Sequence, residues 1–157
     1  MYAPSMADKT SSTMTIDVPR PVIMAVIADF TAYPEWASGV RSAEVIEPGQ
    51  AGRPEQVRFT LDAGIIKDSY VLAYSWDGDE QVRWELAERG SMISEMSGAY
   101  LLDEQGGGTR VTYELAVGLA VPMIGMLKRR AEKTIIDTAL KGLRGRVERL
   151  ADTGGDR

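Results

Sequence analysis

The chain has 157 residues, a formal net charge of −5, and neither cysteine nor histidine. This composition excludes disulfide bonds, Ser-His-Asp and Cys-His catalytic groups, and zinc sites built from cysteine and histidine. A hydrophobic content of 44% and a charged content of 26% are ordinary for a globular protein, and this length predicts one domain with its own core. We expect no metal, no cofactor and no catalytic residue.

The N-terminal segment has no pattern typical of a helix or strand, and we expect residues 1–9 to be a disordered tail. It has no basic start followed by an apolar segment, so it does not resemble a secretory signal. No run of about 20 apolar residues predicts a membrane span. A cytoplasmic location is therefore the default expectation. The predicted domain covers residues 10–151, and residues 152–157 form a second disordered tail.

The first part of the domain combines one strand with two short helices. Residues 10–18 alternate and are rich in β-branched side chains, which predicts a strand that ends at Pro19. Residues 21–30 have the spacing of a short apolar helix with a proline near its start. Pro34 interrupts this helix, and residues 35–37 are expected to form one more helical turn.

From Val40 onward the apolar period changes from 3.6 to 2, which predicts antiparallel strands joined by short, glycine-rich turns. We expect six strands, at residues 40–48, 55–63, 66–76, 80–88, 91–103 and 109–119. Alternation places aromatic and aliphatic side chains on one face of the sheet and charged side chains on the other. Arg58 and Arg83 should therefore point away from the apolar face.

A long amphipathic helix is predicted from Pro122 to about Ala151, with Gly154 and Gly155 as its stop. A strongly twisted sheet can wrap its apolar face around a single element, and only this helix is long enough to fill that role. Its expected inward face consists of Ile124, Leu127, Ala131, Ile135, Thr138, Ala139, Gly142, Leu143, Val147 and Leu150.

Charge is distributed unevenly along the chain. Residues 128–149 carry eight Lys or Arg against three Asp or Glu, although the chain as a whole is acidic. A basic helix on an acidic body suits phosphate on lipid headgroups or RNA, but a solvated outer face explains the same pattern. We expect at most transient contact with an anionic membrane and no nucleic-acid partner.

The order of these elements resembles the helix-grip fold of the START-like (SRPBCC) superfamily. Residues 27–47, which contain a Tyr-Pro-x-Trp sequence, together with residues 106–115 and 140–150, look like segments of the polyketide cyclase/dehydrase and lipid-transport family. The resemblance covers about residues 10–151. It implies an α+β fold in which a strongly curved antiparallel sheet of about seven strands wraps around the C-terminal helix. It also implies a cavity between sheet and helix that holds a hydrophobic or amphipathic small molecule.

Aromatic, methionine and small apolar side chains are the expected lining of this cavity. They are Trp36, Phe59, Tyr70, Leu72, Tyr74, Trp84, Met96, Tyr100, Tyr113, Met123, Leu127, Ala131 and Ile135. Buried tyrosine hydroxyls need partners, so several at one depth suit a pocket that holds water or the polar end of a ligand. Plain core packing is the alternative interpretation of the same residues.

Three further positions have two interpretations each. Trp36 is either a residue at the mouth of the cavity or a hydrophobic plug that closes the core. Gly142 either permits close packing against the sheet or leaves volume for a ligand. Asp68 lies in register with Tyr70 and Leu72. If Asp68 points inward, its pKa is raised and it can act as an acid or base; at the rim it is solvated.

The leading hypothesis is a non-catalytic protein that binds or carries a lipid, quinone or polyketide-like molecule by burying its apolar surface. The first alternative is an enzyme that cyclises or dehydrates a polyketide, which the lack of histidine disfavours. The second is an interaction protein for RNA or the ribosome, which rests on the charge asymmetry alone.

Overall fold

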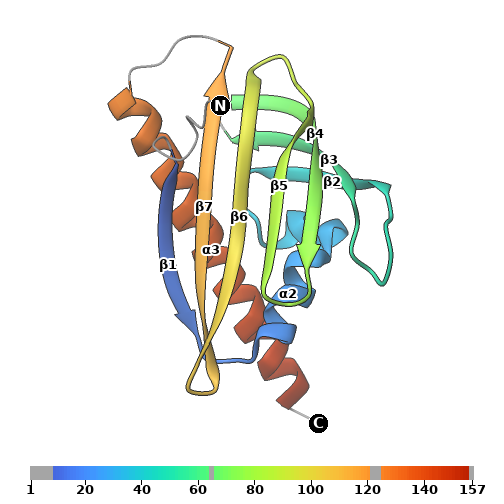
Figure 1. Cartoon of the computed structure of the whole chain (residues 1–157), viewed down its shortest axis with the longest axis vertical. Coiled ribbons are helices and arrows are strands. Elements are labelled where there is room, and N and C mark those ends of the chain that lie inside the picture. Colours follow the sequence, from blue (N-terminus) through green and yellow to red (C-terminus); the bar gives the residue numbers. More distant parts are fainter. Residues whose placement is uncertain (1–8, 64–65, 121–124, 156–157) are drawn as a thin grey trace.

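A seven-stranded antiparallel sheet and one long helix dominate the computed structural model, which describes residues 9–63, 66–120 and 125–155. The strand order in the sheet is β1-β7-β6-β5-β4-β3-β2 (Figure 1). The predicted α+β fold is confirmed. In chain order the elements are β1 (Thr10–Ile16), α2 (Arg20–Ala28), the 3₁₀ helix η1 (Phe30–Glu35), β2 (Val40–Glu47), β3 (Gln56–Ala63), β4 (Ile66–Asp77), β5 (Gln81–Glu88), β6 (Ile93–Gln105), β7 (Gly108–Leu119) and α3 (Gly125–Gly155).

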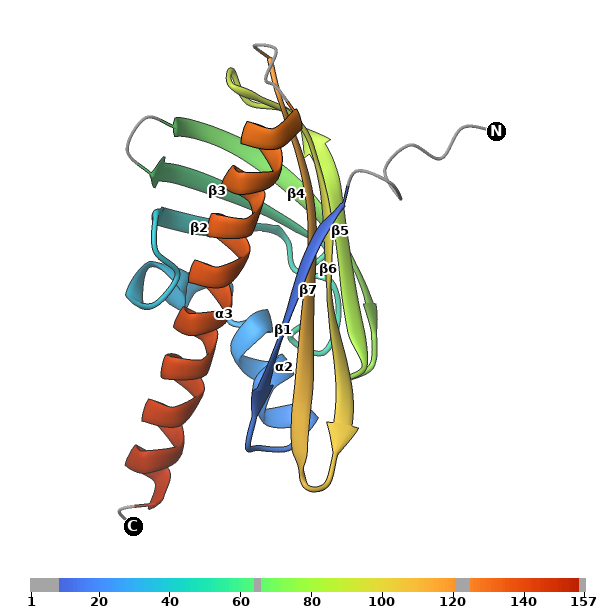
Figure 2. The same ribbon diagram turned by 90° about the vertical axis from the view of Figure 1, so that its left-hand side faces the viewer.

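The sheet curves so that α2 and α3 lie on its concave side (Figures 1 and 2). Pro19 is the N-cap of α2, and Pro21 lies in the first turn of this helix, where a proline is suitable because its missing N–H has no helical partner. Pro34 lies within η1, where a tight 3₁₀ turn replaces the α-helix. The chain then enters β2 and the rest of the meander.

Alternation along the strands determines which side chains enter the core. Val57, Phe59 and Trp84 are buried on the concave side. Arg58 and Arg83, which alternate with them, point outward as predicted, and Arg58 forms an exposed ion pair across the sheet. The period of 2 thus identified the apolar face correctly, because a register error of one residue would have buried these arginines.

The buried face of α3 differs in part from the predicted one. Ile135 and Leu150 were expected inward but are 40% and 44% exposed, and Thr138 is exposed as well. Neighbouring helix residues point about 100° apart, so the adjacent Ile135 and Ile136 offer two alternative faces, and the sequence-based choice was wrong. Among the α3 side chains that the structure describes, the buried ones are Glu132, Ile136, Leu140, Leu143 and Val147.

At its C-terminal end α3 is longer than predicted. The helix continues past the expected limit at Ala151 and includes Gly155. The predicted start at Pro122 and the inward residues Met123 and Ile124 lie outside the described residues, as does the side chain of Leu127.

Glu132 is a buried carboxylate that joins α3 to the edge of the sheet. Its side chain is only 1% exposed. The carboxylate accepts hydrogen bonds from Thr10 Oγ1 of β1 at 2.7 Å, from the Val117 N–H of β7 at 2.8 Å and from Lys128 Nζ at 2.8 Å. Strand β1 begins at Thr10, opposite Leu115. Two residues further along β7, the Val117 N–H has a side-chain carboxylate as its acceptor, so Glu132 satisfies a backbone donor of the sheet from α3.

Replacing Glu132 with alanine leaves the Val117 N–H without an acceptor and removes the link between α3 and β1. We expect the free energy of unfolding to fall by roughly 2–3 kcal/mol, as for loss of one partner in a buried charged network. Urea denaturation at pH 7 measures the change. In the matched control Glu148→Ala, which removes the exposed partner of Arg144, the loss should be about 0.5 kcal/mol or less. Equal losses in the two variants would contradict this role for Glu132.

Candidate functional site

Aromatic rings from five neighbouring elements form one continuous layer on the concave side of the sheet. The ring centroids of Tyr74 and Trp84 are 5.8 Å apart, those of Trp84 and Tyr100 are 5.5 Å apart, and those of Tyr100 and Tyr113 are 4.7 Å apart. Phe30 of η1 extends the layer, with its ring 4.8 Å from Tyr74. Tilted and edge-on rings at these distances attract one another beyond the burial of their surface.

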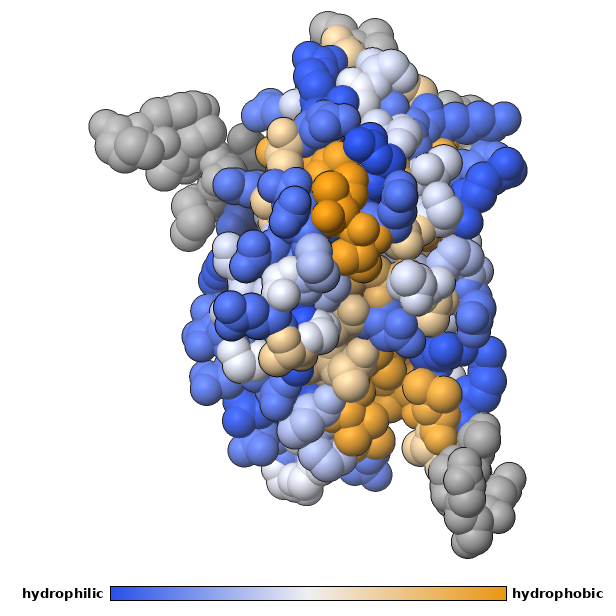
Figure 3. Space-filling view, turned by 90° about the vertical axis from the view of Figure 1, so that its right-hand side faces the viewer, coloured by the Kyte–Doolittle hydropathy of each residue, from blue (hydrophilic) through white to orange (hydrophobic). Residues whose placement is uncertain are grey.

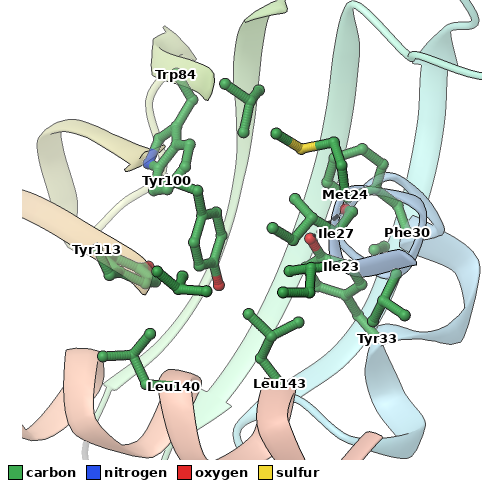
Figure 4. Close-up of a cluster of buried hydrophobic side chains, with 14 of the residues drawn as sticks. Ile23, Met24, Ile27, Phe30, Tyr33, Trp84, Tyr100, Tyr113, Leu140 and Leu143 are labelled. Carbon is green, nitrogen blue, oxygen red and sulfur yellow. Dashed lines mark hydrogen bonds between the residues drawn. The ribbon is translucent and has the colours of Figure 1, made fainter. Parts of the chain in front are cut away.

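Helical residues face this layer. In Figure 4 Tyr100 and Tyr113 lie opposite Ile23 and Ile27 of α2, and the Tyr100 hydroxyl is directed toward the space between them, above α3. Leu140 and Leu143 of α3 line the other side of that space in the same view. The candidate site is therefore enclosed by β4–β7, α2, η1 and the middle of α3.

Gly98 makes room for the largest ring in the layer. It pairs with Trp84 across β5 and β6. A Cβ atom at Gly98 would lie 2.5 Å from Trp84 Cζ2 and 2.6 Å from the Glu114 carbonyl oxygen. Only a glycine lets the indole lie this close to the β6 backbone, so Gly98 determines how far Trp84 extends over the concave face.

The tyrosine hydroxyls of the layer differ in their hydrogen bonding. Tyr33 donates to the Ile27 carbonyl oxygen. No hydrogen bond joins the hydroxyls of Tyr70, Tyr74, Tyr100 and Tyr113 to another described residue, and within the described ranges Trp36 Nε1 is the sole fully buried side-chain nitrogen or oxygen without a partner. These four hydroxyls are therefore not sealed in the core, and each borders space that water or ligand atoms can enter.

Burial raises the pKa of all four of these phenols and that of Tyr33, and interactions among the phenols themselves raise several further. For Tyr74, the contributing neighbours after burial are Tyr113, Tyr70 and Tyr100. Mutual influence of this kind requires the hydroxyls to lie near one another. The layer consequently presents a group of neutral hydrogen-bonding phenols at physiological pH.

Most of the residues predicted for the cavity come together in this core. Phe59, Tyr70, Leu72, Trp84, Tyr100, Tyr113 and Trp36 are buried in one cluster, and Tyr74 and Met96 pack against it partly exposed. Ala131 is half-buried. Ile135 points outward, so its prediction as a lining residue was wrong. Met123 and the side chain of Leu127 lie outside the described residues.

Sequence reasoning missed the contribution of α2 and part of that of α3. Ile23 and Ile27 are one helical turn apart and both fully buried. This i, i+4 spacing was visible in the sequence and would have identified them as facing the core. Leu140 was missed because the adjacent, also apolar Ala139 was assigned to the inward face of α3 instead. The same ambiguity between neighbouring apolar residues led to the choice of Ile135 over Ile136.

Trp36 packs between the aromatic layer and α3. Its ring is 4.8 Å from that of Tyr33, and the residue is 9% exposed. A Cβ atom at Gly142 would lie 2.6 Å from the Trp36 carbonyl oxygen, so Gly142 serves close packing at this point. Trp36 was expected either at the mouth of the cavity or as a hydrophobic plug, and its burial agrees with the plug.

Asp68 does not point into the core as an acid or base. It accepts backbone N–H groups from Ser91, Met92 and Ile93 at 2.8, 3.0 and 2.7 Å, in the connection from β5 to β6, and from Ser69 at 3.0 Å. Burial alone would raise the pKa of this carboxyl, but these N–H groups outweigh it and hold the pKa below the ordinary value. The interpretation of Asp68 as an inward carboxylate with a raised pKa is therefore wrong. The N–H groups of residues 91–93 bind the carboxylate, and nothing in the sequence indicated that they lie close to it.

An open groove of about 290 Å³ lies on the surface between α2 and the C-terminal part of α3. Figure 3 shows hydrophobic surface gathered at this end of the molecule. Val22 and Leu150 are exposed there, and Arg146 pairs with Glu35 at 2.9 Å. The residues that line the groove are Val22, Ala25, Val26, Asp29, Trp36, Arg146 and Leu150.

Ion pairs compensate several of the basic residues on α3. Lys128 pairs with Glu132, Lys133 with Asp137, Arg144 with Glu148 and Arg146 with Glu35. Contact with an anionic membrane stays a prediction. In the described ranges no helix has the length and hydropathy that crossing a bilayer requires, and no group of three or more acidic side chains is arranged to hold a metal ion.

Comparison with known proteins agrees with this architecture. The family model for polyketide cyclase / dehydrase and lipid transport matches residues 7–153. The chain belongs to this family. No curated protein sequence matches it.

Three solved structures show how widely the fold of this family member is shared. A START superfamily protein from Mycobacterium smegmatis is 22% identical and superposes with a TM-score of 0.83, covering 90% of this chain and 98% of its own. A protein from Thermus thermophilus is also 22% identical, with a TM-score of 0.75 and the same coverage. The Zhui aromatase/cyclase from Streptomyces sp. R1128 is 16% identical, with a TM-score of 0.69, covering 90% of this chain and 93% of its own. At these identities the likeness concerns the fold alone.

The raised tyrosine pKa values predict an unusual alkaline titration. In the unfolded chain phenols ionise near pH 10, whereas the five buried phenols stay protonated to higher pH in the folded state. Below pH 10 both states keep their protons and the phenols add no pH dependence. Above about pH 10 the free energy of unfolding should fall, because the unfolded state loses its protons first.

Phenolate absorbance recorded together with circular dichroism tests this. We expect the five phenols to ionise only as the secondary structure is lost. Reversible ionisation of all five near pH 10 in a chain that stays folded would contradict their burial.

The hydrogen bonds to Asp68 predict a contribution to stability that depends on its charge. Asp68→Asn should lower the free energy of unfolding at pH 7 by about 1 kcal/mol, at the low end for charged hydrogen bonds because the carboxylate is partly solvated. In the wild type this contribution is present above the ordinary carboxyl pKa and is lost as the pH falls through the lowered folded-state pKa. Urea denaturation at pH 7 and pH 3 measures both effects. Asp62→Asn, which removes an exposed partner of Arg41, is the control and should change stability less; an equal change would refute the proposed loop contacts.

Proposed function

We propose that this protein binds a hydrophobic or amphipathic small molecule between the curved sheet and α3, and that it acts as a carrier or binding protein. One observation carries the proposal. Four tyrosine hydroxyls border an otherwise aromatic and aliphatic interior and have no hydrogen-bond partner among the described residues. A dry core would leave these groups unsatisfied at a cost in stability, whereas a ligand with a polar end satisfies them.

The walls supply the main driving force for such binding. Burying apolar ligand surface contributes about 25 cal/mol per Å², so a ligand that buries about 300 Å² gains roughly 7 kcal/mol before the cost of ordering it. Aromatic rings on one side and Leu140 and Leu143 on the other offer this apolar surface. The phenols then orient the polar end, as the few polar groups of ligand pockets commonly do.

The charged and phenolic groups of the described residues fit a binding function better than a catalytic one. Glu132, the one charged side chain that is buried among the described residues, already accepts three hydrogen bonds at the sheet edge. Asp68 is engaged by the loop between β5 and β6. The phenols have raised pKa values and keep their protons at neutral pH, so they are weak bases there. A cyclase activity like that of the Streptomyces protein remains the alternative.

Ligand retention by two matched variants tests the proposal. Leu140→Trp adds a large side chain on the inner face of α3, and Ile135→Trp adds the same side chain on its exposed face. If the interior holds a ligand, Leu140→Trp should displace most of it with little loss of stability, whereas Ile135→Trp should retain it. Native mass spectrometry of protein purified from its expression host, with extraction and identification of the bound compound, measures occupancy.

Two results would sink the proposal. One is a wild-type protein that carries no compound and binds neither lipids nor quinones in titrations followed by tryptophan fluorescence. The other is a strong destabilisation of Leu140→Trp, of about 1–3 kcal/mol, because overpacking of that size signals a core with no free space.

A further inference from the structure

The sheet has two free edges, and the strands that form them differ. Strand β2 carries features that natural sheets use against edge-to-edge association. Its pairing with β3 contains two register shifts, and Arg41, Glu44 and Glu47 are exposed along it. Strand β1 pairs with β7 through seven consecutive residues without such a shift, and it contains neither proline nor a charged residue. The edge at β1 is therefore regular and unprotected.

The free side of β1 is open to an approaching strand. Figure 2 shows β1 along the near edge of the sheet with α3 beside it, and apart from α3 no described helix or strand lies beyond β1 in Figure 1. Helix α3 reaches β1 from the concave side, where Thr10 donates to Glu132. Because β1 pairs with β7 on one side only, its outward N–H and C=O groups are available to a second ladder.

The sequence of β1 is compatible with its own copy in the antiparallel direction. Thr13 is the middle residue of the strand, so a second copy centred there places Thr13 opposite itself and Ser11 opposite Thr15. These three side chains are exposed and share one face of the sheet. Threonine and serine form favourable cross-strand pairs. The same register brings Lys9 opposite Asp17 at both ends of the strand pair.

The two residues that flank β1 have complementary charges in this register. Alternation places Lys9, before the strand, and Asp17, after it, on the same face as Thr13. Asp17 is exposed and has no hydrogen bond or ion pair with another described residue. Lys9 Nζ lies 3.9 Å from a Glu114 oxygen, which is a long ion pair within its own chain. A second copy supplies the cation that Asp17 lacks, and two-fold symmetry forms this pair twice.

From these observations we propose that β1 is an interaction surface for a second copy of this chain, and that two copies join antiparallel at β1 to form one continuous sheet. Cross-strand Thr and Ser pairs and two Lys9–Asp17 ion pairs determine the register. A single strand edge buries less than the roughly 1,200 Å² of a standard stable interface, so the dimer is weak, with a Kd of about 10–100 µM. The contact lies outside the interior and does not depend on ligand binding there.

Sedimentation velocity of the full wild-type chain at pH 7 tests the association without any substitution. We expect the weight-average sedimentation coefficient to rise from the monomer value to the dimer value between tenfold below and tenfold above that Kd. A chain that stays monomeric across this range would overturn the proposal.

Charges placed on the two-fold axis test which surface is used. In Thr13→Lys and in Thr13→Glu like charges meet at the axis, so each variant should dimerise at least tenfold more weakly than the wild type. An equimolar mixture of the two should recover the dimer, because lysine then meets glutamate. Ser42→Lys adds the same charge to the exposed edge of β2 and is the matched control, with a Kd expected within twofold of the wild type. A mixture that associates no better than its components, or an equal effect of Ser42→Lys, would show that the dimer does not form at β1.

The flanking ion pairs are tested in the same way by residues outside the strand, where substitution does not disturb its pairing with β7. Lys9→Glu and Asp17→Lys should each weaken the dimer about fivefold, because each places like charges opposite each other at both ends. Mixed together, the two variants regain both opposite-charge pairs and should associate as the wild type does. Circular dichroism checks that each variant is folded. Failure of this mixture to associate more tightly than either variant alone would refute the antiparallel register centred on Thr13.

Discussion

Attachment of α3 to the concave face of the sheet is the constraint on which the rest of the structure depends. Along most of its length the helix is held by aliphatic side chains such as Ile136 and Val147. Near its start it is held by the carboxylate of Glu132, which binds β1 and β7 at once. The helix covers only part of a strongly curved sheet, so α2 and η1 are needed to enclose the remainder, and the aromatic layer lies between these three helical elements and the strands.

Tyrosine suits that layer because it joins a large apolar ring to one polar atom. The rings pack at centroid distances near 5 Å and bury extensive surface, which stabilises the sheet without a ligand. The hydroxyls give the same surface a hydrogen-bonding function. Burial raises their pKa values, so the hydroxyls are available for hydrogen bonds as neutral groups. In the proposed function, the same side chains therefore provide both stability and ligand recognition.

Prediction from sequence succeeded where the signal was local and periodic. The strands were placed to within about two residues, because alternation and glycine-rich turns are properties of short segments. The inward direction of Trp84 and the outward direction of Arg83 followed from the same period. Prediction failed for Ile135, since two adjacent isoleucines are equally apolar and only contact with the sheet chooses between them. It failed for Asp68, since its donors come from a loop more than 20 residues away.

The sequence by itself determined the architecture, the apolar face of each strand and the absence of cysteine and histidine chemistry, because these depend on composition and on patterns within one element. The tertiary structure alone decided which polar groups are satisfied. Glu132 looked like an exposed helix charge and is a buried link between elements. The Tyr33 hydroxyl binds a backbone carbonyl, whereas the Tyr100 hydroxyl borders the interior, and residue type alone does not distinguish the two. Hydrogen-bond partners are set by distances between segments remote in the chain, and no local pattern records those distances.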